Sequence, residues 1–249
     1  MNQRIFLTYR AALFIVVGVL CIGLAPAKAS TVTALIDFAN YAPGGLSPTT
    51  GTVWNNVAPA TTVNSLVDTG NNAFGTLTFG TGGTNVWLST GNPGFSGAIG
   101  NFPSTATGDF MFIDQTYTSA TFTLTGLDTT GTISYSFKWL SSRATQDGTG
   151  RPLTLTFTGA NSGFATENAT NAGDALGNST FQTVSGIFAD NTGTITVVGT
   201  NSPTHFAYLN AIQIDATAGV PEPTTIALSI LGGLGLFVVV VRRRQLAKA

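Results

Sequence analysis

Apolar and hydroxyl-bearing residues alternate along short stretches of the chain between residues 33 and 214. In Thr121–Thr125, Phe122 and Leu124 alternate with threonines, which places both apolar side chains on one face of an extended segment. Tyr135, Phe137 and Trp139 form a second set with the same period of two. This period is typical of half-buried antiparallel strands, so the pattern predicts β-sheet with one face in a core.

Turn sequences separate these stretches at short intervals. Asp128–Gly131, Asp147-Gly148 and Asp190–Gly193 each place a short acidic side chain, which can accept backbone hydrogen bonds, before a Gly that tolerates positive φ. Residues 40–62 and 159–180 are predicted to be long loops, and no part of the body has a convincing helical period or a fixed-length repeat. The expected fold is all-β, a sandwich or a barrel. The predicted strands are Thr33–Phe38, Phe74–Phe79, Ser119–Thr125, Thr132–Leu140, Leu153–Thr158, Gln182–Phe188, Thr194–Val198 and Phe206–Ile214.

The amino terminus has the three parts of a secretory leader. Arg4 and Arg10 make a positive start, residues 11–25 are apolar, and Ala27-Lys28-Ala29 is a small-residue exit. We therefore expect export through the Sec machinery and cleavage by signal peptidase before Ser30. An uncleaved amino-terminal anchor is disfavoured because the apolar run is short for a bilayer span.

The single cysteine, Cys21, lies inside this leader. Lipid modification there is disfavoured because Leu20, and not a small residue, precedes it. The mature protein is therefore expected to have no thiol, disulfide or cysteine metal ligand.

The carboxyl end combines an apolar helix with a basic tail. Thr224–Val241 holds 18 residues without a charge, and at ~1.5 Å per residue a helix of that length is close to the hydrocarbon thickness of a membrane. Arg242, Arg243, Arg244 and Lys248 follow. Because basic clusters stay in the cytoplasm, we expect this segment to span the membrane and the body to face outward.

A proline-rich tetrapeptide, Val220-Pro221-Glu222-Pro223, precedes this helix. Each proline fixes its own φ and pushes the preceding residue toward extended geometry, so Glu222 is expected in a stiff, polyproline-like stretch. A protease groove can accept such a stretch. The alternative is a plain spacer between the body and the membrane.

The last 30 residues, Val220–Ala249, together resemble the PEP-CTERM sorting signal of exported proteins from Gram-negative bacteria that make extracellular polysaccharide. The resemblance implies recognition by exosortase, an integral-membrane cysteine transpeptidase, which removes the helix and passes the body to the surface or matrix. Pro221, Glu222 and Pro223 would be the recognition residues. The catalytic cysteine would belong to the enzyme, and this chain would be its substrate.

Charge is scarce and unevenly distributed. Charged residues make up 8% of the chain, which disfavours surface helices, while 43% hydrophobic residues can supply a core. Between Ser30 and Gly219 there are three basic and ten acidic side chains, a net charge of −7. We therefore expect no nucleic-acid partner and repulsion from anionic lipid.

Four segments of the body are similar, as a set, to jelly-roll domains with a galactose-binding-like appearance in secreted proteins of such bacteria. They are Leu35–Phe38, Trp54–Asn56, Ser141–Arg143 and Tyr208–Ile212. The resemblance spans roughly residues 32–216 and implies a jelly-roll sandwich, but a fold alone does not imply an activity.

Candidate catalytic chemistry is sparse. The only imidazole is His205, beside Pro203, and we expect it in a turn or at a strand edge, not in a triad or a zinc site. The acids occur mostly in turn sequences, which disfavours the paired carboxylates of a glycoside hydrolase. No cofactor is expected except a candidate structural calcium ion at Asp37 and Asp215, in the first and last strands.

Carbohydrate binding is a second candidate activity. Trp54, Trp87, Tyr41 and Tyr117 lie in or near loops and are candidate contacts for sugar rings, whereas Trp139 is expected in the core. The favoured interpretation is a non-enzymatic, exported envelope or extracellular-matrix protein. The alternatives are a module or adhesin that binds extracellular polysaccharide and a weakly marked hydrolase. The expected organisation is a signal peptide at 1–29, a β-sandwich at 30–219 and a sorting segment at 220–249, with its tetrapeptide at 220–223, helix at 224–241 and basic tail at 242–249.

Overall fold

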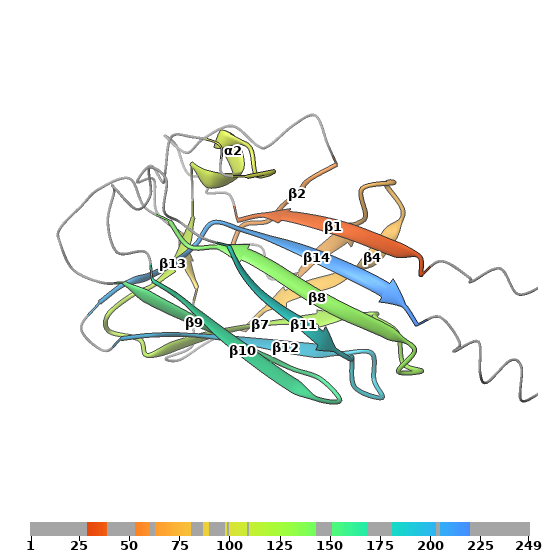
Figure 1. Cartoon of the computed structure of the whole chain (residues 1–249). Helices are drawn as coiled ribbons and strands as arrows, with labels where there is room; N and C mark the ends of the chain where they lie inside the picture. The colour runs from red at the N-terminus through yellow and green to blue at the C-terminus, as the bar shows by residue number, and fades with distance from the viewer. Residues whose placement is uncertain are drawn as a thin grey trace, which may run out of the picture. The chain divides into compact units, whose positions relative to one another are not determined.

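The alternating sequences form the strands of a layered β structure, shown as a computed structural model in Figure 1. The structure describes residues 29–38, 53–59, 63–80, 87–89, 98, 100–108, 110–142, 151–168, 181–202 and 205–219. Within them, Ser30–Ala218 forms one compact unit.

One layer is a five-stranded sheet in the order β11-β8-β14-β1-β2. Its central strands β8, β14 and β1 pair antiparallel, and β14 pairs with β1 over its length from Thr31↔Thr217 to Asp37↔Ala211. The short β2 pairs parallel to β1. The strands are β11 (Gln182–Ile187), β8 (Ile133–Leu140), β14 (Ala211–Ala218), β1 (Thr31–Asp37) and β2 (Asn55–Asn56).

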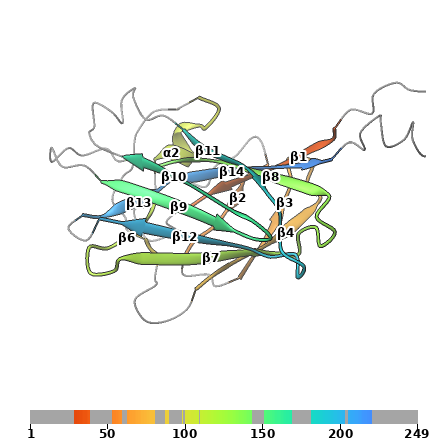
Figure 2. The same cartoon turned by 60° about the horizontal axis from the view of Figure 1, so that its bottom comes forward.

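The second layer is a six-stranded antiparallel sheet in the order β10-β9-β12-β7-β4-β3. Figure 2 shows β10, β9, β12 and β7 side by side. The strands are β10 (Ser162–Asn168), β9 (Pro152–Thr158), β12 (Ile195–Asn201), β7 (Ser119–Thr125), β4 (Ala73–Phe79) and β3 (Val63–Val67).

A three-stranded sheet, β13-β6-β5, and the four-residue helix α2 (Ser104–Thr107) complete the elements of the described part. The strands are β13 (Ala207–Leu209), β6 (Met111–Ile113) and β5 (Leu88–Ser89). The chain passes from β13 to β14 through Asn210, so it moves there from the three-stranded sheet to the five-stranded one.

The main core lies between the two large sheets. Phe137 of β8 stacks on Phe157 of β9 with ring centroids 4.2 Å apart. The ring centroids of Phe38 and Phe122 lie 6.0 Å apart. In β7 the burial alternates strictly, with Phe122 and Leu124 buried and the threonines half-buried. The predicted all-β sandwich is therefore confirmed, and Trp139 lies in its core, fully buried.

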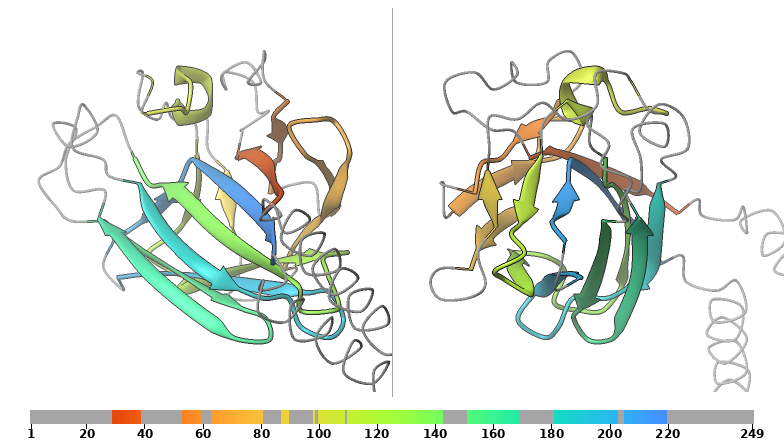
Figure 3. Two further views of the ribbon diagram at one scale, coloured as in Figure 1. Left: turned by 45° about the vertical axis from the view of Figure 1, so that its right-hand side comes forward. Right: turned by 90° about the vertical axis from the view of Figure 1, so that its left-hand side faces the viewer.

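The two sheets meet along one edge, where β10 and β11 lie side by side in both views of Figure 3. The loop after β9 holds this edge, because the Asn161 amide donates to Gly186 O at 2.7 Å and its Oδ1 accepts from Phe188 N at 2.8 Å. A Cβ on Gly163 would lie 2.8 Å from Val184 Cγ1. Glycine at this position allows the two strands to approach.

All eight predicted strands are found, Ser119–Thr125 with the predicted bounds and the others with shifted ends, and five further strands of the described residues were missed. The predicted loop at 159–180 is wrong in part because it contains β10, and β2 lies within the predicted loop at 40–62. The predicted last strand is divided at Asn210 into β13 and β14. The other missed strands are β3, β5 and β6.

Among the described residues, no helix has both the length and the apolar character needed to cross a membrane. The predicted spanning helix at 224–241 lies outside these residues.

Candidate functional site

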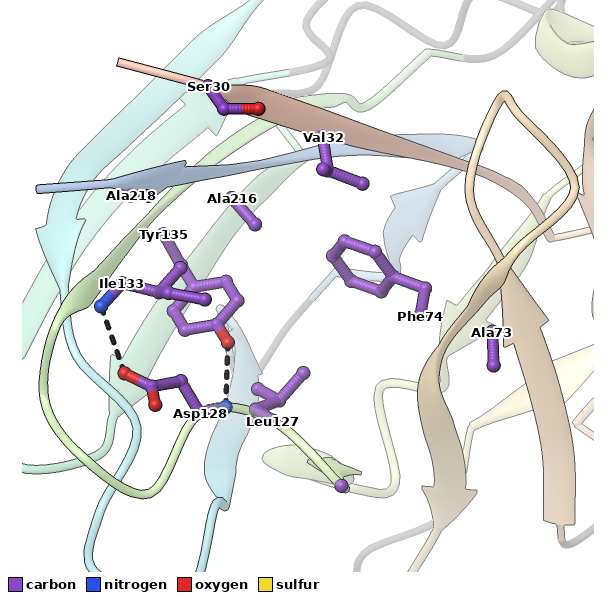
Figure 4. A pocket seen from close by; sticks show the side chains of 11 residues that line it. Ser30, Val32, Ala73, Phe74, Leu127, Asp128, Ile133, Tyr135, Ala216 and Ala218 are labelled. Carbon is purple, nitrogen blue, oxygen red and sulfur yellow. Dashed lines mark hydrogen bonds between the residues drawn. The ribbon is translucent and has the colours of Figure 1, made fainter. Parts of the chain in front are cut away.

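A pocket of about 420 Å³ opens between the two large sheets, at the end where β1 begins and β14 ends. In Figure 4, Phe74 of β4 and Tyr135 of β8 point into it from opposite sheets. Its volume is within the usual range for ligand pockets, and its walls are mostly apolar. The lining residues are Ser30, Val32, Ala73, Phe74, Gly126, Leu127, Asp128, Ile133, Tyr135, Ala216 and Ala218.

The two ionisable groups of this pocket are held by local hydrogen bonds. The Tyr135 hydroxyl accepts from Asp128 N at 2.9 Å, and burial raises the pKa of the phenol. The Asp128 carboxylate turns into its own loop, where Oδ2 accepts from Ile133 N at 2.9 Å (Figure 4). The pocket can accommodate a small apolar group, but these two side chains serve the fold.

Four described aspartates, Asp68, Asp114, Asp128 and Asp190, each accept hydrogen bonds from the backbone of their own turn, as the sequence predicted for most of the acids. Asp190 Oδ1 accepts from Thr192 Oγ1 at 2.6 Å, and this bond is the main reason why its pKa is lowered. Asp68 Oδ1 accepts from Gly70 N and Asn72 N, both at 2.8 Å. Its pKa is also lowered, chiefly by the hydrogen bond from the backbone N–H of Asn72.

The four segments behind the jelly-roll resemblance converge on two asparagines. Asn210 accepts from Ser142 N at 2.6 Å through Oδ1 and donates to Thr107 O at 3.0 Å. It therefore connects the end of β8, the start of β14 and helix α2. Asn55 joins β1 to β3 in the same way, because it donates to Leu35 O at 2.9 Å and to Val67 O at 2.8 Å. Both asparagines are buried, which makes these segments structural junctions.

The candidate calcium ligands do not meet. The first and last strands, β1 and β14, pair, but Asp215 faces Thr33 while Asp37 faces Ala211. Four residues along β1 separate them, roughly 13 Å in an extended strand. Asp215 instead accepts from Thr33 Oγ1 at 2.6 Å and from Gln213 Nε2 at 2.8 Å. No cluster of three or more metal-ligating side chains occurs in the described ranges.

Of the four candidate sugar contacts, none presents a freely accessible ring in the described part of the chain. Trp87 is 3% exposed and packs in the main core, so it is not available to stack on a sugar. Trp54 is half-buried, with its ring 5.6 Å from that of Phe102 in an edge contact. Tyr117 is half-buried against the main core, and Tyr41 lies outside the described residues.

Aromatic side chains surround Arg151 near the three-stranded sheet. Its Nη1 donates to the Tyr208 hydroxyl at 3.2 Å, and its guanidinium lies 5.5 Å from the Phe206 ring centroid. Arg151 is buried, so this cation–π arrangement orders the start of β9 against β13.

His205 lies in a turn just before β13, as predicted, and its backbone N–H donates to Ser202 O at 3.0 Å. Asn201 also binds this turn, because its amide donates to His205 O at 2.9 Å.

The residues of the predicted processing signals fall almost entirely outside the described residues. These are Ala27, the tetrapeptide Val220–Pro223 and the basic residues Arg242–Arg244. Ala29 and Ser30 are described and exposed, and Ser30 O accepts from Ala218 N at 3.1 Å.

One surface residue was missed in the sequence. Phe164 of β10 is 72% exposed, the most exposed large apolar side chain in the described ranges. It lies in a segment predicted to be a loop. The signal that could have located it is the order Gly163-Phe164-Ala165, an aromatic residue between two small ones in a strand-like sequence.

No protein-family model matches the chain, and comparison with curated proteins found no match.

Proposed function

We propose that this protein is a non-enzymatic component of the cell envelope or extracellular matrix, delivered as the substrate of an exosortase-like sorting enzyme. The leader at 1–29 directs it out of the cytoplasm. The segment at 220–249 then holds it in the inner membrane, with the body outside, until the enzyme releases the body to the outer surface or matrix.

The observation that carries this proposal is the placement of the two ends of the body. β1 and β14 are neighbouring strands, and Ala218 N donates to Ser30 O at 3.1 Å. The leader and the tail therefore join the body at the same end of the sandwich. Since the main core is built from residues between Ile36 and Ala216, both segments can be removed without cutting the core.

The strand connections support the jelly-roll interpretation of the sandwich. From β7 onward the chain passes repeatedly between the two large sheets, as at β7 to β8, β8 to β9 and β11 to β12. Strands that alternate between two antiparallel sheets in this way are typical of jelly rolls.

A structural role accounts for the described carboxylates better than hydrolysis does. Asp68, Asp114, Asp128 and Asp190 accept hydrogen bonds within their own turns. A glycosidase pair needs two carboxyl groups facing each other across a groove, and Asp37 and Asp215 are too far apart along their strands for that.

The test is a change at Glu222 in the native host. The chain has two glutamates, so Glu222→Ala is compared with the matched variant Glu167→Ala. Intact-mass measurement should give a mature body that lacks both terminal segments for wild type and Glu167→Ala. Glu222→Ala should accumulate as a longer species in the membrane fraction.

An identical mature mass for Glu222→Ala and wild type would show that this tetrapeptide does not direct processing. The orientation is checked separately by a reporter fused after Ala249, which should be active only in the cytoplasm. Activity on the outer side would contradict the proposed topology.

A further inference from the structure

The outer surface of the six-stranded sheet carries in-register rows of threonine and serine. The inward side chains of β9, β12 and β7 are buried in the core, so the alternate residues of these strands face outward. We call this surface the threonine face. Its side chains are half-buried or exposed. The rows are Ser162, Thr158, Thr196, Thr123, Thr78; Phe164, Thr156, Val198, Thr121; and Thr166, Thr154, Thr200, Ser119.

The middle row differs in chemistry from the two that flank it. It holds Phe164, 72% exposed, and the half-buried Val198, with Thr156 between them. From β10 to β4 the flanking rows consist only of hydroxyl-bearing residues. The middle row therefore carries two apolar side chains among threonines, and it is bordered on both sides by groups that donate and accept hydrogen bonds.

The threonine face carries no charge, although the body as a whole is strongly acidic. The outer side of the five-stranded sheet is different, because it carries Lys138 and Asp215. Lys138 donates to Asn101, and Asp215 accepts from Thr33. A charged partner would find nothing to pair with on the threonine face, whereas a neutral partner loses no ionic hydration there.

We propose that the threonine face binds a chain of a neutral, extended polysaccharide that lies across the strands over the middle row. A sugar ring has an apolar C–H face and hydroxyls around its edge. Phe164 and Val198, which are two strands apart, would contact the apolar faces of two rings of the same chain, with the ring between them over Thr156, and the flanking hydroxyls would bond the ring edges. Strands lie ~4.8 Å apart and outward residues ~6.8 Å apart along a strand, so a ring on the middle row is within reach of both flanking rows.

Internal hydrogen bonds do not prevent this role. Thr154 Oγ1 and Thr166 Oγ1 lie 2.7 Å apart and share one hydrogen bond. A hydroxyl has one donor and two acceptor sites, so a bonded pair still offers acceptors to a ligand. Such pairing orients the side chains before the ligand arrives, which lowers the entropy cost of binding.

The test measures retention of the full chain, purified in mild detergent, on microcrystalline cellulose, insoluble chitin and a β-1,3-glucan, with calcium alginate beads as an anionic comparison. We expect retention on at least one neutral polysaccharide and none on alginate. Phe164→Ala should weaken that retention about two- to tenfold. Phe164→Trp should preserve it, and Thr156→Lys, which places a charge in the middle row, should abolish it.

Thr31→Lys is the matched control, because Thr31 is exposed on β1 of the other large sheet and faces the uncharged Thr217. It should bind like wild type. Unchanged melting temperatures would show that the threonine-face variants are folded. Equal retention of all variants overturns the proposal, as does an absence of retention of wild type on every neutral polysaccharide. Self-association that is lost in Phe164→Ala, without polysaccharide binding, also overturns it and assigns the face to a second copy of the chain.

The inference rests on the proposed function only in one respect, namely that the body meets the polysaccharide outside the cytoplasm. Binding is measured with purified protein, whereas sorting is measured by mature mass in the host. Failure of the Glu222 experiment therefore leaves the binding result standing, and failure of the binding experiment leaves the sorting result standing.

Discussion

Two turns of the protein share the spacing Asp-x-Thr-Gly-Thr but use their carboxylates differently. Asp128 uses both oxygens, since Oδ1 accepts from Thr130 and Oδ2 accepts from Thr132 N at 2.8 Å and Ile133 N at 2.9 Å. In the structure Asp190 accepts its turn bonds through Oδ1 alone. An asparagine keeps one oxygen and replaces the other with a donor. The two sites should therefore respond differently to the same substitution.

We predict that Asp128→Asn lowers the melting temperature at pH 7 clearly more than Asp190→Asn does. In Asp128→Asn the new amide group would face backbone N–H groups, whereas Asp190→Asn can retain the one accepting oxygen that its turn uses. Hydrogen bonds from Thr130 hold the pKa of Asp128 well below its ordinary value. A depressed folded pKa gives stability that is complete above the unfolded value near 3.9 and is lost as the pH falls through the folded value. The gap between wild type and Asp128→Asn should thus narrow as the pH is lowered from about 5 to about 2.

Thermal unfolding followed by circular dichroism across this pH range checks both parts. A gap that stays constant down to pH 2 would mean that the charge of Asp128 does not contribute to stability. Equal losses for the two variants at pH 7 would contradict the assigned geometry of the carboxylates.

Single residues also show where sequence patterns stop being informative. In β10 the large residue, Phe164, faces solvent, and the small residues Gly163 and Ala165 face inward because Val184 and Ile187 occupy the space there. The usual alternation is inverted, so the segment was predicted to be a loop. Trp87 was predicted to be an exposed contact, but its ring fills the space beside Gly199, 2.6 Å from where a Cβ would lie. The residues that decide these two placements, Val184 and Ile187 for β10 and Gly199 for Trp87, are distant in the sequence.

At the scale of elements, the loop between β7 and β8 packs against the loop between β11 and β12. Leu127 N donates to Gly193 O at 3.1 Å. Gly131 and Gly193 occupy the same place in the two turns, with φ of 71° and 73°. A Cβ on Gly193 would lie 2.6 Å from Leu127 O, whereas a Cβ on Gly131 would meet nothing within 4 Å. Substitution of these two glycines therefore distinguishes the cost of backbone strain from the cost of steric overlap.

We predict that Gly131→Ala destabilises the protein by about 1 kcal/mol, the usual cost of left-handed geometry. Gly193→Ala carries that strain and must also displace Leu127, so its cost should be about 2–4 kcal/mol. Urea unfolding of both variants measures the difference. Equal costs would mean that the two loops do not pack as described.

The strands that alternate cleanly could be predicted from sequence, and those made by tertiary contacts could not. Phe206–Ile214 was expected as one strand because Asn210 and Gln213 are the only side chains in it other than apolar and aromatic ones. The division at Asn210 depends on bonds to Ser142 and Thr107, far away in the chain. The aspartate turns were predictable for the opposite reason, since their donors lie within five residues of each acid.

At the scale of the whole molecule, the order of strands brings the first and last strands of the body together in the middle of one sheet. β1 lies between β14 and β2, and Ala34, Ile36 and Phe38 are completely buried. The sequence placed Asp37 and Asp215 in the first and last strands, but the register that separates the two carboxylates depends on the whole sheet. The loop aromatics predicted as sugar contacts are likewise placed by packing between distant parts of the chain, and the surface proposed to bind polysaccharide is the threonine face instead.

This arrangement predicts sharply different outcomes for two truncations at the amino terminus. Residues 30–219 should fold alone with a cooperative thermal transition, because the main core starts at Ile36 and ends at Ala216. Residues 39–219 should not fold. Burial of each large apolar side chain contributes about 1.5–3 kcal/mol, and removal of β1 also leaves the inner edges of β14 and β2 without their pairing partner. The total loss is comparable to the ~5–15 kcal/mol that holds a domain folded.

Circular dichroism and analytical gel filtration of the two fragments, beside the full chain in detergent, make the comparison. A cooperative transition in the shorter fragment would contradict the central position of β1. Loss of structure in residues 30–219, with a folded full chain, would mean that the terminal segments belong to the folded body. They could not then be removed during maturation without unfolding it, so this physical measurement bears directly on whether the body can be released from its anchor.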